Sequence, residues 1–371
     1  MVNLRKKQNN RQPKKRFKTY RIKIDAKKEL GLNIPKEQKI TIPIFIPHVG
    51  CNNECVFCNQ RRISGQKKPV YPSDVEVQIE DSLEKYNKGD KKIEVAFFGG
   101  SFTGIDKKMQ EEYLKVVNKY IDKGQISGIR ISTRPDYINQ EILDLLKKYN
   151  VKIIELGVQS MDDEVLSKSK RGHTSEDVKK ASLLIKQNGF ILGHQLMCGL
   201  PGSTYNKEQE SIKASLELLP DLIRIYPVYV LEDSELYDMY KGRKYKPLEL
   251  EEAIGRATMM YKECIKKGVN VIRVGLQTTE EISEKNSKII GPVCDNYRER
   301  ILSKIMLGVI ENKLDKKCVD FKIDKNKEKN KITILELVVP SSQVNYAIGN
   351  NKCNKKYLEE KDVCYVKVIQ K

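Results

Sequence analysis

The sequence reads Gly50-Cys-Asn-Asn-Glu-Cys-Val-Phe-Cys-Asn59 just after an apolar run, and this stretch holds three of the chain's nine cysteines. The spacing Cys-x3-Cys-x2-Cys lets three thiolates on one short loop converge on a single metal centre. Clustered thiols in a chain of this size are typical of metal binding, not of a disulfide scaffold. Because Fe–S clusters normally take four Cys ligands, three leave one iron open. A zinc site closed by His48 is the alternative.

Short apolar runs alternate with longer amphipathic runs from residue 40 onward. The apolar runs predict strands at Ile42–Ile46, Ile93–Phe98, Ile129–Ser132, Ile153–Val158, Gly193–Met197 and Leu222–Tyr226. The amphipathic runs predict helices at Val75–Tyr86, Met109–Ile121, Gln140–Tyr149, Ser175–Asn188 and Lys207–Leu218. This alternation indicates parallel βα units, so we expect an α/β fold built on a partial (β/α)6 barrel of the TIM type. Periodicity alone does not distinguish a barrel from a doubly wound sheet, so the doubly wound sheet is the alternative.

Unusual residues follow the predicted strands, at the ends where such folds place their chemistry. In chain order they are the cysteine loop, Gly99-Gly100-Ser101, Arg134, Gln159-Ser160 and Cys198. We therefore expect them to line one face of the fold. Cys198 is interpreted as a small buried hydrophobe. His194, inside a predicted strand, is interpreted as a satisfied core residue without a functional role.

The cysteine spacing, with the aromatic Phe57 before the last cysteine, resembles the signature of radical S-adenosylmethionine (SAM) enzymes. The resemblance implies a [4Fe-4S] cluster held by Cys51, Cys55 and Cys58, with SAM bound at the open iron. It also implies reductive cleavage of SAM to methionine and a 5′-deoxyadenosyl radical, with an electron donor such as ferredoxin or flavodoxin. The protein then supplies binding, orientation and exclusion of side reactions.

The same resemblance implies contacts to SAM near the glycines. Gly99 and Gly100, followed by Ser101, lie where that superfamily has its Gly-Gly motif, which implies backbone contact with the SAM amino group. Phe57 is expected to pack beside the cluster or the adenine. An ordinary βα turn is the alternative interpretation of the glycines.

Three polar residues complete the expected SAM site. Arg134 is expected to pair with the SAM carboxylate, because a guanidinium matches carboxylate geometry. Gln159 and Ser160 are expected to hold the ribose hydroxyls. The alternatives are a surface salt bridge for Arg134 and ordinary strand ends for the other two.

Several longer segments resemble the catalytic subunit of the elongator complex. They are Thr133–Tyr137, Glu155–Ser160, Arg171–Thr174, Ile225–Pro227 and Val271–Gln277. That family modifies the wobble uridine of tRNA, using SAM and acetyl-CoA. Its best-known members have a longer gap between the first two cysteines and an acetyltransferase domain, which this sequence does not show. The resemblance therefore implies an elongator-like group without acetyltransferase domain, and tRNA as the substrate.

Basic residues dominate the composition, with 69 Lys and Arg against 50 Asp and Glu and a formal net charge of +19. Eight of them lie between Arg5 and Lys18, without an acidic residue. Such a block predicts a flexible basic arm over residues 1–39 that contacts nucleic acid. The candidate contacts are Arg5, Lys14, Lys15 and Arg16. A general bias toward lysine is the alternative explanation of the charge.

The remaining sequence divides into a core barrel (40–230), a helical extension (231–290) and a small α+β domain (291–371). The predicted order of elements in the small α+β domain is helix Tyr297–Glu311, strands Val319–Ile323 and Ile332–Val339, helices Ser341–Ile348 and Asn354–Glu360, and strand Val363–Ile369. This order resembles a type II KH domain, in which a Gly-x-x-Gly loop clamps the nucleic-acid backbone. Gly349 and Lys352 occupy the loop positions here, with lysine in place of the second glycine. A generic α+β cap is the alternative.

No apolar run approaches the roughly 18 residues that a membrane span needs, and no secretory signal is evident. We expect a cytoplasmic protein without a membrane partner. The sequence therefore predicts a radical SAM enzyme acting on tRNA. Two alternatives remain, a radical SAM enzyme acting on a small molecule such as a porphyrin, and a non-catalytic RNA-binding protein with a structural metal.

Overall fold

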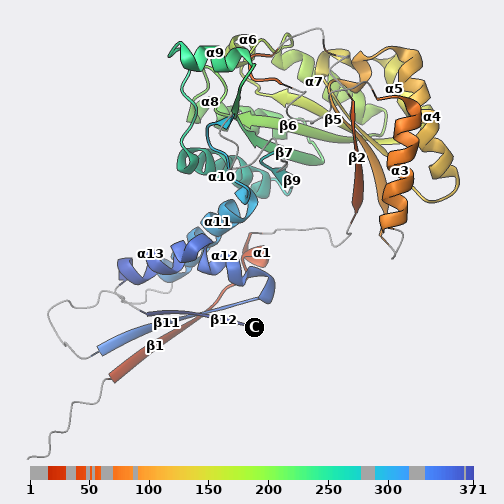
Figure 1. Cartoon of the computed structure of the whole chain (residues 1–371). Helices are drawn as coiled ribbons and strands as arrows, with labels where there is room; N and C mark the ends of the chain where they lie inside the picture. The colour runs from red at the N-terminus through yellow and green to blue at the C-terminus, as the bar shows by residue number, and fades with distance from the viewer. Residues whose placement is uncertain are drawn as a thin grey trace, which may run out of the picture. The chain divides into compact units, whose positions relative to one another are not determined.

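The computed structural model describes residues 16–30, 39–46, 51, 55–59, 70–86, 91–276, 289–316, 331–362 and 365–371. They form two compact units (Figure 1). The large unit lies within residues 31–301. The small unit combines described residues up to 30 with those from 302 onward.

A seven-stranded parallel sheet forms the centre of the large unit, and its strands follow one another in chain order. They are β2 (Ile40–Ile46), β3 (Ile93–Gly99), β4 (Ile129–Thr133), β5 (Val151–Gln159), β6 (Ile191–Cys198), β7 (Leu222–Pro227) and β9 (Asn270–Val274). All six predicted strands are confirmed. Because a doubly wound sheet reverses its strand order at a switch point, the sequential order excludes that alternative. The sheet instead curls into a half-barrel (Figure 1).

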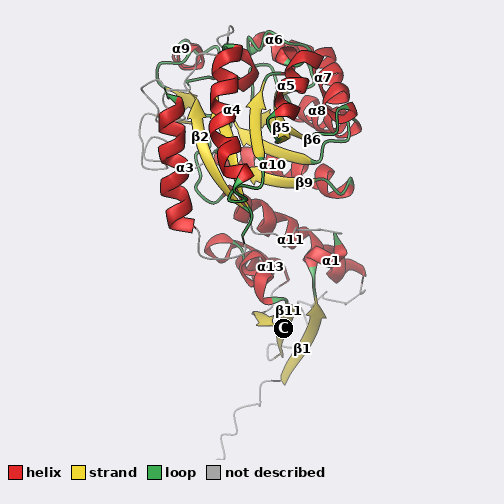
Figure 2. Ribbon diagram, turned by 90° about the vertical axis from the view of Figure 1, so that its right-hand side faces the viewer, coloured by secondary structure: helices red, strands yellow, loops and turns green. Residues whose placement is uncertain are grey.

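Helices cover the outer face of this sheet (Figure 2). They are α3 (Pro72–Tyr86), α4 (Lys107–Asp122), α5 (Gln140–Lys148), α7 (Ser175–Gln187) and α8 (Tyr205–Glu217), whereas the short α6 (Asp163–Lys168) lies at the top of the unit in Figure 1. Their starts are marked by side chains that cap free backbone N–H groups, for example Asn139 before α5 and Thr174 before α7. The extension after β7 is not purely helical. Besides α9 (Glu235–Lys241) and α10 (Leu250–Lys266), it contains β9 and the two-stranded pair β8 (Val230–Leu231) and β10 (Ile289–Ile290).

Charged side chains line the face of the sheet that turns away from the helices. Arg130 of β4 donates to Glu94 of β3 (Nη2 to Oε1, 2.6 Å) and to Glu155 of β5. Arg224 of β7 contacts Glu155 (Nε to Oε2, 2.7 Å) and lies over the Phe98 ring. Two arginines therefore offset two buried carboxylates, as buried charges require. The inner face is a polar surface and not a second apolar core.

His194 is fully buried on the opposite side of β6. Its Nε2 lies 2.9 Å from Ser182 Oγ in α7, and its Nδ1 lies 2.8 Å from Ser215 Oγ in α8. Both ring nitrogens are satisfied, so the interpretation as a core residue is confirmed. Burial lowers the pKa of His194 to about 3.

This histidine predicts an acid-sensitive fold. In the unfolded chain the imidazole takes up a proton near pH 6.5, whereas in the folded chain it does so only near pH 3. The unfolded state therefore binds more protons as the pH falls, and stability is lost. Between pH 6.5 and 5 the loss from His194 is about 2 kcal/mol. Urea unfolding of wild type and His194→Gln at both pH values measures it, and equal losses in the two proteins would argue against this assignment.

The small unit is built on a second parallel sheet with the strand order β1-β11-β12. Its strands are β1 (Arg16–Lys23), β11 (Lys331–Val339) and β12 (Tyr365–Gln370). Its helices are α1 (Ala26–Glu29), α12 (Val344–Ile348), α13 (Cys353–Asp362) and the part of α11 (Tyr297–Lys316) from Leu302 onward. One apolar core joins the three strands to these helices and includes Ile22, Ile310, Leu337, Leu358 and Val366.

The expectation of a flexible arm over residues 1–39 is wrong for residues 16–30. Arg16 opens β1, and Ile22 and Ile24 are buried in the core of the small unit. The alternation Ile22-Lys-Ile24 has the two-residue period of a strand, which the density of basic residues concealed. Arg5, Lys14 and Lys15 lie outside the described residues, as does the predicted strand at Val319–Ile323.

Candidate active site

The cysteine loop follows β2, and its backbone is held by two neighbouring helices. The Val56 side chain is buried in an apolar cluster with Val165 of α6 and Leu236 of α9, and Phe57 packs against the same cluster. Val56 N donates to Ser169 O (3.2 Å), and Leu236 N donates to Val56 O (2.8 Å). The described part of the loop around Val56 is therefore held by contacts that do not involve its thiols.

The thiols differ in their surroundings. Cys51 Sγ lies 3.3 Å from Ser101 Oγ, so the residue after the two glycines contacts the first cysteine. Arg171, from the loop between α6 and α7, donates from Nη1 to the buried Cys55 Sγ (3.0 Å) and from Nη2 to Gly157 O (2.7 Å). Cys58 is half-buried. The Arg171 guanidinium therefore places a positive charge directly beside one of the three sulfur atoms.

Arg134 is the second buried guanidinium of this region, with only 2% of its surface exposed. Its Nε and Nη2 donate to the two carboxylate oxygens of Asp136 (3.0 and 2.9 Å). Its Nη1 is buried and has no hydrogen-bond partner among the described residues. A buried donor without a partner is costly, so an anionic ligand at this position gains a charge-assisted hydrogen bond.

His173 lies close to both arginines. Burial, followed by the positive charges of Arg171 and Arg134, lowers the pKa of His173 to about 4, so the ring is neutral at physiological pH. Its Nε2 lies 3.3 Å from Val158 O, while Nδ1 is buried without a partner in the described part of the chain. The two arginines therefore supply the positive charge of this region.

Gly99 closes β3 against the end of β2. Its φ is +108°, and a Cβ built there would lie 2.3 Å from Ile46 O, the carbonyl that ends the strand before the cysteine loop. Gly100 N lies 3.5 Å from the same carbonyl. Only glycine fits at position 99, because both the backbone angle and the space exclude a side chain.

Alanine at position 99 is expected to damage both the fold and the cysteine loop. The strained φ and the backbone clash together predict a loss of about 3 kcal/mol or more in the free energy of unfolding. Gly124→Ala is the matched control, since Gly124 also has a positive φ (+72°) but open space around it. Gly124→Ala is expected to lower the free energy of unfolding by about 1 kcal/mol and to leave the iron content unchanged. Chemical denaturation and iron analysis compare the two, and equal costs would remove the steric argument.

The side chains of Gln159 and Ser160 have different hydrogen-bond partners. Gln159 has a φ of +66° where β5 loses register with β6, and its amide exchanges hydrogen bonds with the Gln195 amide (3.1 and 2.8 Å). Ser160 Oγ lies 3.0 Å from Ser211 Oγ of α8 and accepts from Asp162 N. Any ribose contact of Ser160 must compete with these two partners.

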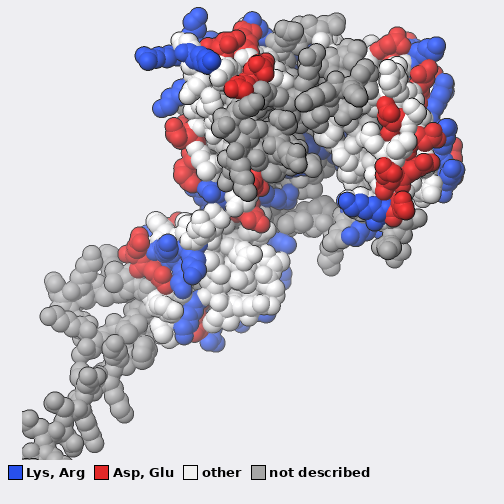
Figure 3. Space-filling model, viewed as in Figure 1, with Lys and Arg blue, Asp and Glu red and all other residues white. Residues whose placement is uncertain are grey.

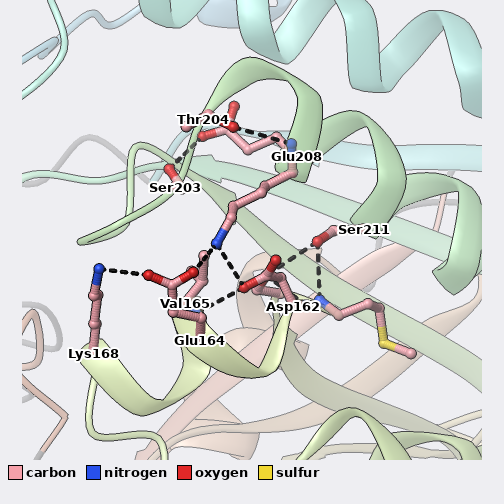
Figure 4. A network of polar contacts seen from close by, with 11 residues as sticks. Asp162, Glu164, Val165, Lys168, Ser203, Thr204, Glu208 and Ser211 are labelled. Atoms are coloured by element: carbon pink, nitrogen blue, oxygen red, sulfur yellow. Dashed lines mark hydrogen bonds and ion pairs between the residues drawn. The ribbon is translucent and has the colours of Figure 1, made fainter.

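Ser160 belongs to a polar network that ties α6 to α8 (Figure 4). Lys207 of α8 contacts Asp162 (3.2 Å) and Glu164, and hydrogen bonds from Lys168 and Lys207 lower the pKa of Glu164 to about 2. Glu208 of α8 accepts from Gly199 N (2.7 Å) and from Ser203 Oγ (2.8 Å). Glu208 therefore holds the loop after Cys198, a role that sequence reasoning missed.

The residues fit the cluster that the sequence implied. Three thiols follow one strand, a guanidinium donates to one of them, and Arg134 keeps an unpaired donor for an anion. Among the described residues, no three His, Cys, Asp or Glu side chains are close enough to hold a single ion. The fit thus rests on the donor set and its positive surroundings, which suit a multi-iron cluster with a net negative charge.

Family comparisons agree with the fold. Residues 45–214 match the model of the radical SAM superfamily, and residues 220–306 match the model of the radical SAM C-terminal domain. A half-barrel that carries three cysteines after its first strand is the architecture of this class. The chain belongs to the radical SAM superfamily, and its similarity to elongator-like proteins agrees with the predicted group.

Three known proteins illustrate these similarities. The tRNA uridine(34) acetyltransferase of Methanocaldococcus jannaschii is 34% identical over 194 residues, which cover 47% of this chain and 36% of that protein. The heme chaperone HemW of Bacillus subtilis is 27% identical over 215 residues, or 57% and 56% of the two chains. The structure of Methanocaldococcus infernus Elp3 has the same fold, with a TM-score of 0.56, 24% identity and coverage of 78% of this chain and 68% of that one. The chain spans about a third of the length of the acetyltransferases it matches first.

No helix in the described ranges is long and apolar enough to cross a membrane.

Proposed function

We propose that this protein is a radical SAM enzyme that modifies tRNA. Cys51, Cys55 and Cys58 would hold a [4Fe-4S] cluster, which, when bound, supplies the electron that cleaves SAM to methionine and a 5′-deoxyadenosyl radical. A small reduced donor such as ferredoxin or flavodoxin would deliver that electron. The need for reduced thiols and a reduced donor supports a cytoplasmic location.

In this scheme the chain's own residues would bind and orient the cluster and SAM. Arg171 would hold the Cys55 sulfur through its hydrogen bond, and the Nη1 of Arg134 would donate to the SAM carboxylate. Gly99 and Gly100 let the backbone approach the SAM amino group. Gln159 and Ser160 would meet the ribose, and Phe57, held by the apolar cluster, would shield the cluster or the adenine from water.

The observation that carries the tRNA substrate is the division of charge between the two units. The small unit, residues 1–30 and 302–371, has 27 Lys and Arg against 11 Asp and Glu. The much longer large unit has 42 against 39. The excess positive charge is therefore concentrated in one module, which a general lysine bias does not explain. Figure 3 shows Lys and Arg side chains beside uncharged surface on the described part of the small unit. Such a module attracts a polyanion.

The glycine loop of the small unit supports the same substrate. Gly349 has a φ of +79°, and a Cβ there would lie 2.7 Å from Asn354 N. The buried Asn354 side chain donates from Nδ2 to Ser303 O (2.8 Å) and Tyr346 O (2.9 Å), which fixes the loop between α12 and α13. Lys352, also at positive φ, stands on this rigid turn. This arrangement supports a KH-like contact of Gly349 and Lys352 with an RNA backbone. The basic residues Arg5, Lys14, Lys15 and Arg16 would add further phosphate contacts.

Binding of tRNA at increasing salt tests the substrate class. A protein that neutralises six or more phosphates is expected to lose affinity by about 10³-fold between 50 and 200 mM salt. A steep salt dependence supports the proposal. Absence of binding at moderate salt contradicts the tRNA substrate and favours a small molecule such as a porphyrin, the alternative to which the similarity with a heme chaperone points.

Metal analysis tests the catalytic half of the proposal. Protein reconstituted anaerobically with iron and sulfide is expected to show the charge-transfer absorbance of an iron–sulfur cluster. Bound zinc without that absorbance would instead support a non-catalytic RNA-binding protein with a structural metal.

A further inference from the structure

The sheet of the small unit has one covered face and one open face. Tyr20, Ile22, Leu335, Leu337 and Val366 turn toward the helices and form the core. Residues of the opposite parity turn away from it, and among the described residues no helix packs over them (Figures 1 and 2). The register of the three strands therefore sets the composition of the open face.

Pairing across the strands arranges in three rows the residues of the open face whose side chains are described. They are Thr19-Ile334-Tyr365, Arg21-Glu336-Lys367 and Lys23-Val338-Ile369. The central strand contributes Ile334 and Val338 on either side of Glu336, and cations lie on both edge strands, with Arg21 and Lys23 on β1 and Lys367 on β12. The one carboxylate, Glu336, is neutralised by Arg21 (Nη2 to Oε2, 2.8 Å). The face thus combines apolar surface with a net positive rim.

Tyr365 is an exposed aromatic ring in the described part of this face. Lys355 of α13 lies over it, with Nζ 4.9 Å from the ring centroid, yet 52% of the tyrosine remains exposed. The lysine covers one side of the ring and leaves surface for a second planar group. Because Lys352 and Lys355 belong to the glycine loop and the helix after it, this corner also connects the loop to the open face.

We infer that the open face binds an unpaired segment of RNA, with a base stacked on Tyr365 and phosphates on Lys355, Lys367 and Lys23. Stacking on an exposed aromatic ring combined with flanking cations is how proteins hold single-stranded nucleic acid without reading its sequence. The inference rests on the proposed function and deepens it, since it assigns the unpaired part of the substrate to this sheet. Paired regions of tRNA offer no free base for such a contact.

Equilibrium binding of the full-length protein to a short labelled oligouridine and to bulk tRNA tests the inference. Tyr365→Ala is expected to weaken oligouridine binding by about 5- to 100-fold, since a stacked base is lost. Tyr365→Phe keeps the ring and should bind as wild type does. Lys367→Glu should reduce the salt dependence of log K by about 0.7 or more, because a phosphate contact is removed.

Tyr357 provides the matched control. It is an exposed tyrosine of the same unit (42%) with Lys361 over its ring, but its hydroxyl donates to Glu311, whose carboxylate also pairs with Lys361. It lies on α13, outside the open face. Tyr357→Ala is expected to leave the affinity for RNA unchanged, and circular dichroism verifies that each variant is folded.

Each contrary result identifies what has failed. Unchanged binding by Tyr365→Ala, or equal weakening by Tyr365→Phe, overturns the stacking role. A wild-type protein that binds tRNA but not oligouridine overturns the inference and leaves the proposed function standing. Self-association that Tyr365→Ala abolishes, with unchanged RNA affinity, would assign the face to a second copy of the chain. Absence of binding to either RNA removes the proposed substrate itself.

Discussion

Cys55→Ala is expected to abolish iron loading while the half-barrel stays folded. The thiol is one of three proposed ligands, and two cysteines with one open position do not retain a four-iron cluster. The fold survives because the loop is held by Val56, through its buried side chain and its hydrogen bonds to Ser169 and Leu236, and not by the thiol.

The substitution has a modest cost in stability. Cys55 is buried and accepts from Arg171, so the loop is less peripheral than its sequence suggested. Removing the sulfur leaves Arg171 Nη1 without this partner, and the free energy of unfolding should fall by about 1–3 kcal/mol.

Cys264→Ala is the control for this experiment. Cys264 is a buried thiol in α10 whose pKa is raised to about 12 by burial, so it is protonated and unsuited to bind metal. The control should lose some packing energy and keep its iron. Iron and sulfide analysis of both variants after anaerobic reconstitution decides the matter, and full cluster occupancy in Cys55→Ala would refute the ligand assignment.

Arg134→Gln is expected to weaken SAM binding by about 10- to 100-fold without removing the cluster. The buried Nη1 of Arg134 has no hydrogen-bond partner among the described residues and would donate to the SAM carboxylate. A hydrogen bond to a charged group contributes about 1.5–3 kcal/mol, which sets the size of the expected loss. Isothermal titration of the cluster-loaded protein with SAM measures the change. Affinity equal to that of wild type would show that the SAM carboxylate binds elsewhere.

Two further variants separate binding from folding in that experiment. Because Arg134→Gln leaves Asp136 without its bidentate partner, the double variant Arg134→Gln/Asp136→Asn restores neutrality and should recover stability but not SAM affinity. Arg256→Gln breaks a comparable pair with the buried Glu208 (3.0 Å) in a different part of the unit. It is expected to lose stability and to bind SAM as wild type does.

The sequence predicted those parts of the fold whose pattern is local. Strands β2 to β7 were predicted because each is a short apolar run, and helix α7 because its run is clearly amphipathic. Apart from the two-residue strands β8 and β10, two strands were missed, for different reasons. The alternation in β1 is concealed by its basic residues, and β9 is five residues long within a segment that otherwise looks helical.

In the site, too, contacts between residues close in sequence were easier to predict than contacts between residues far apart in sequence. The pair of Arg134 with Asp136 spans two residues and follows from the sequence once the strand end is known. The contact of Arg171 with Cys55 joins residues 116 positions apart, and the amide pair of Gln159 with Gln195 joins residues 36 apart. Such contacts depend on which strands become neighbours, which a single sequence does not state.

The most direct test of the central claim is the yield of 5′-deoxyadenosine from the cluster-loaded protein. The protein is incubated anaerobically with dithionite and SAM, with and without bulk tRNA, and Cys55→Ala serves as the blank. We predict formation of 5′-deoxyadenosine by wild type, more of it when tRNA is present, and none from the variant. A fully loaded wild-type protein that forms none under either condition would contradict the assignment as a radical SAM enzyme.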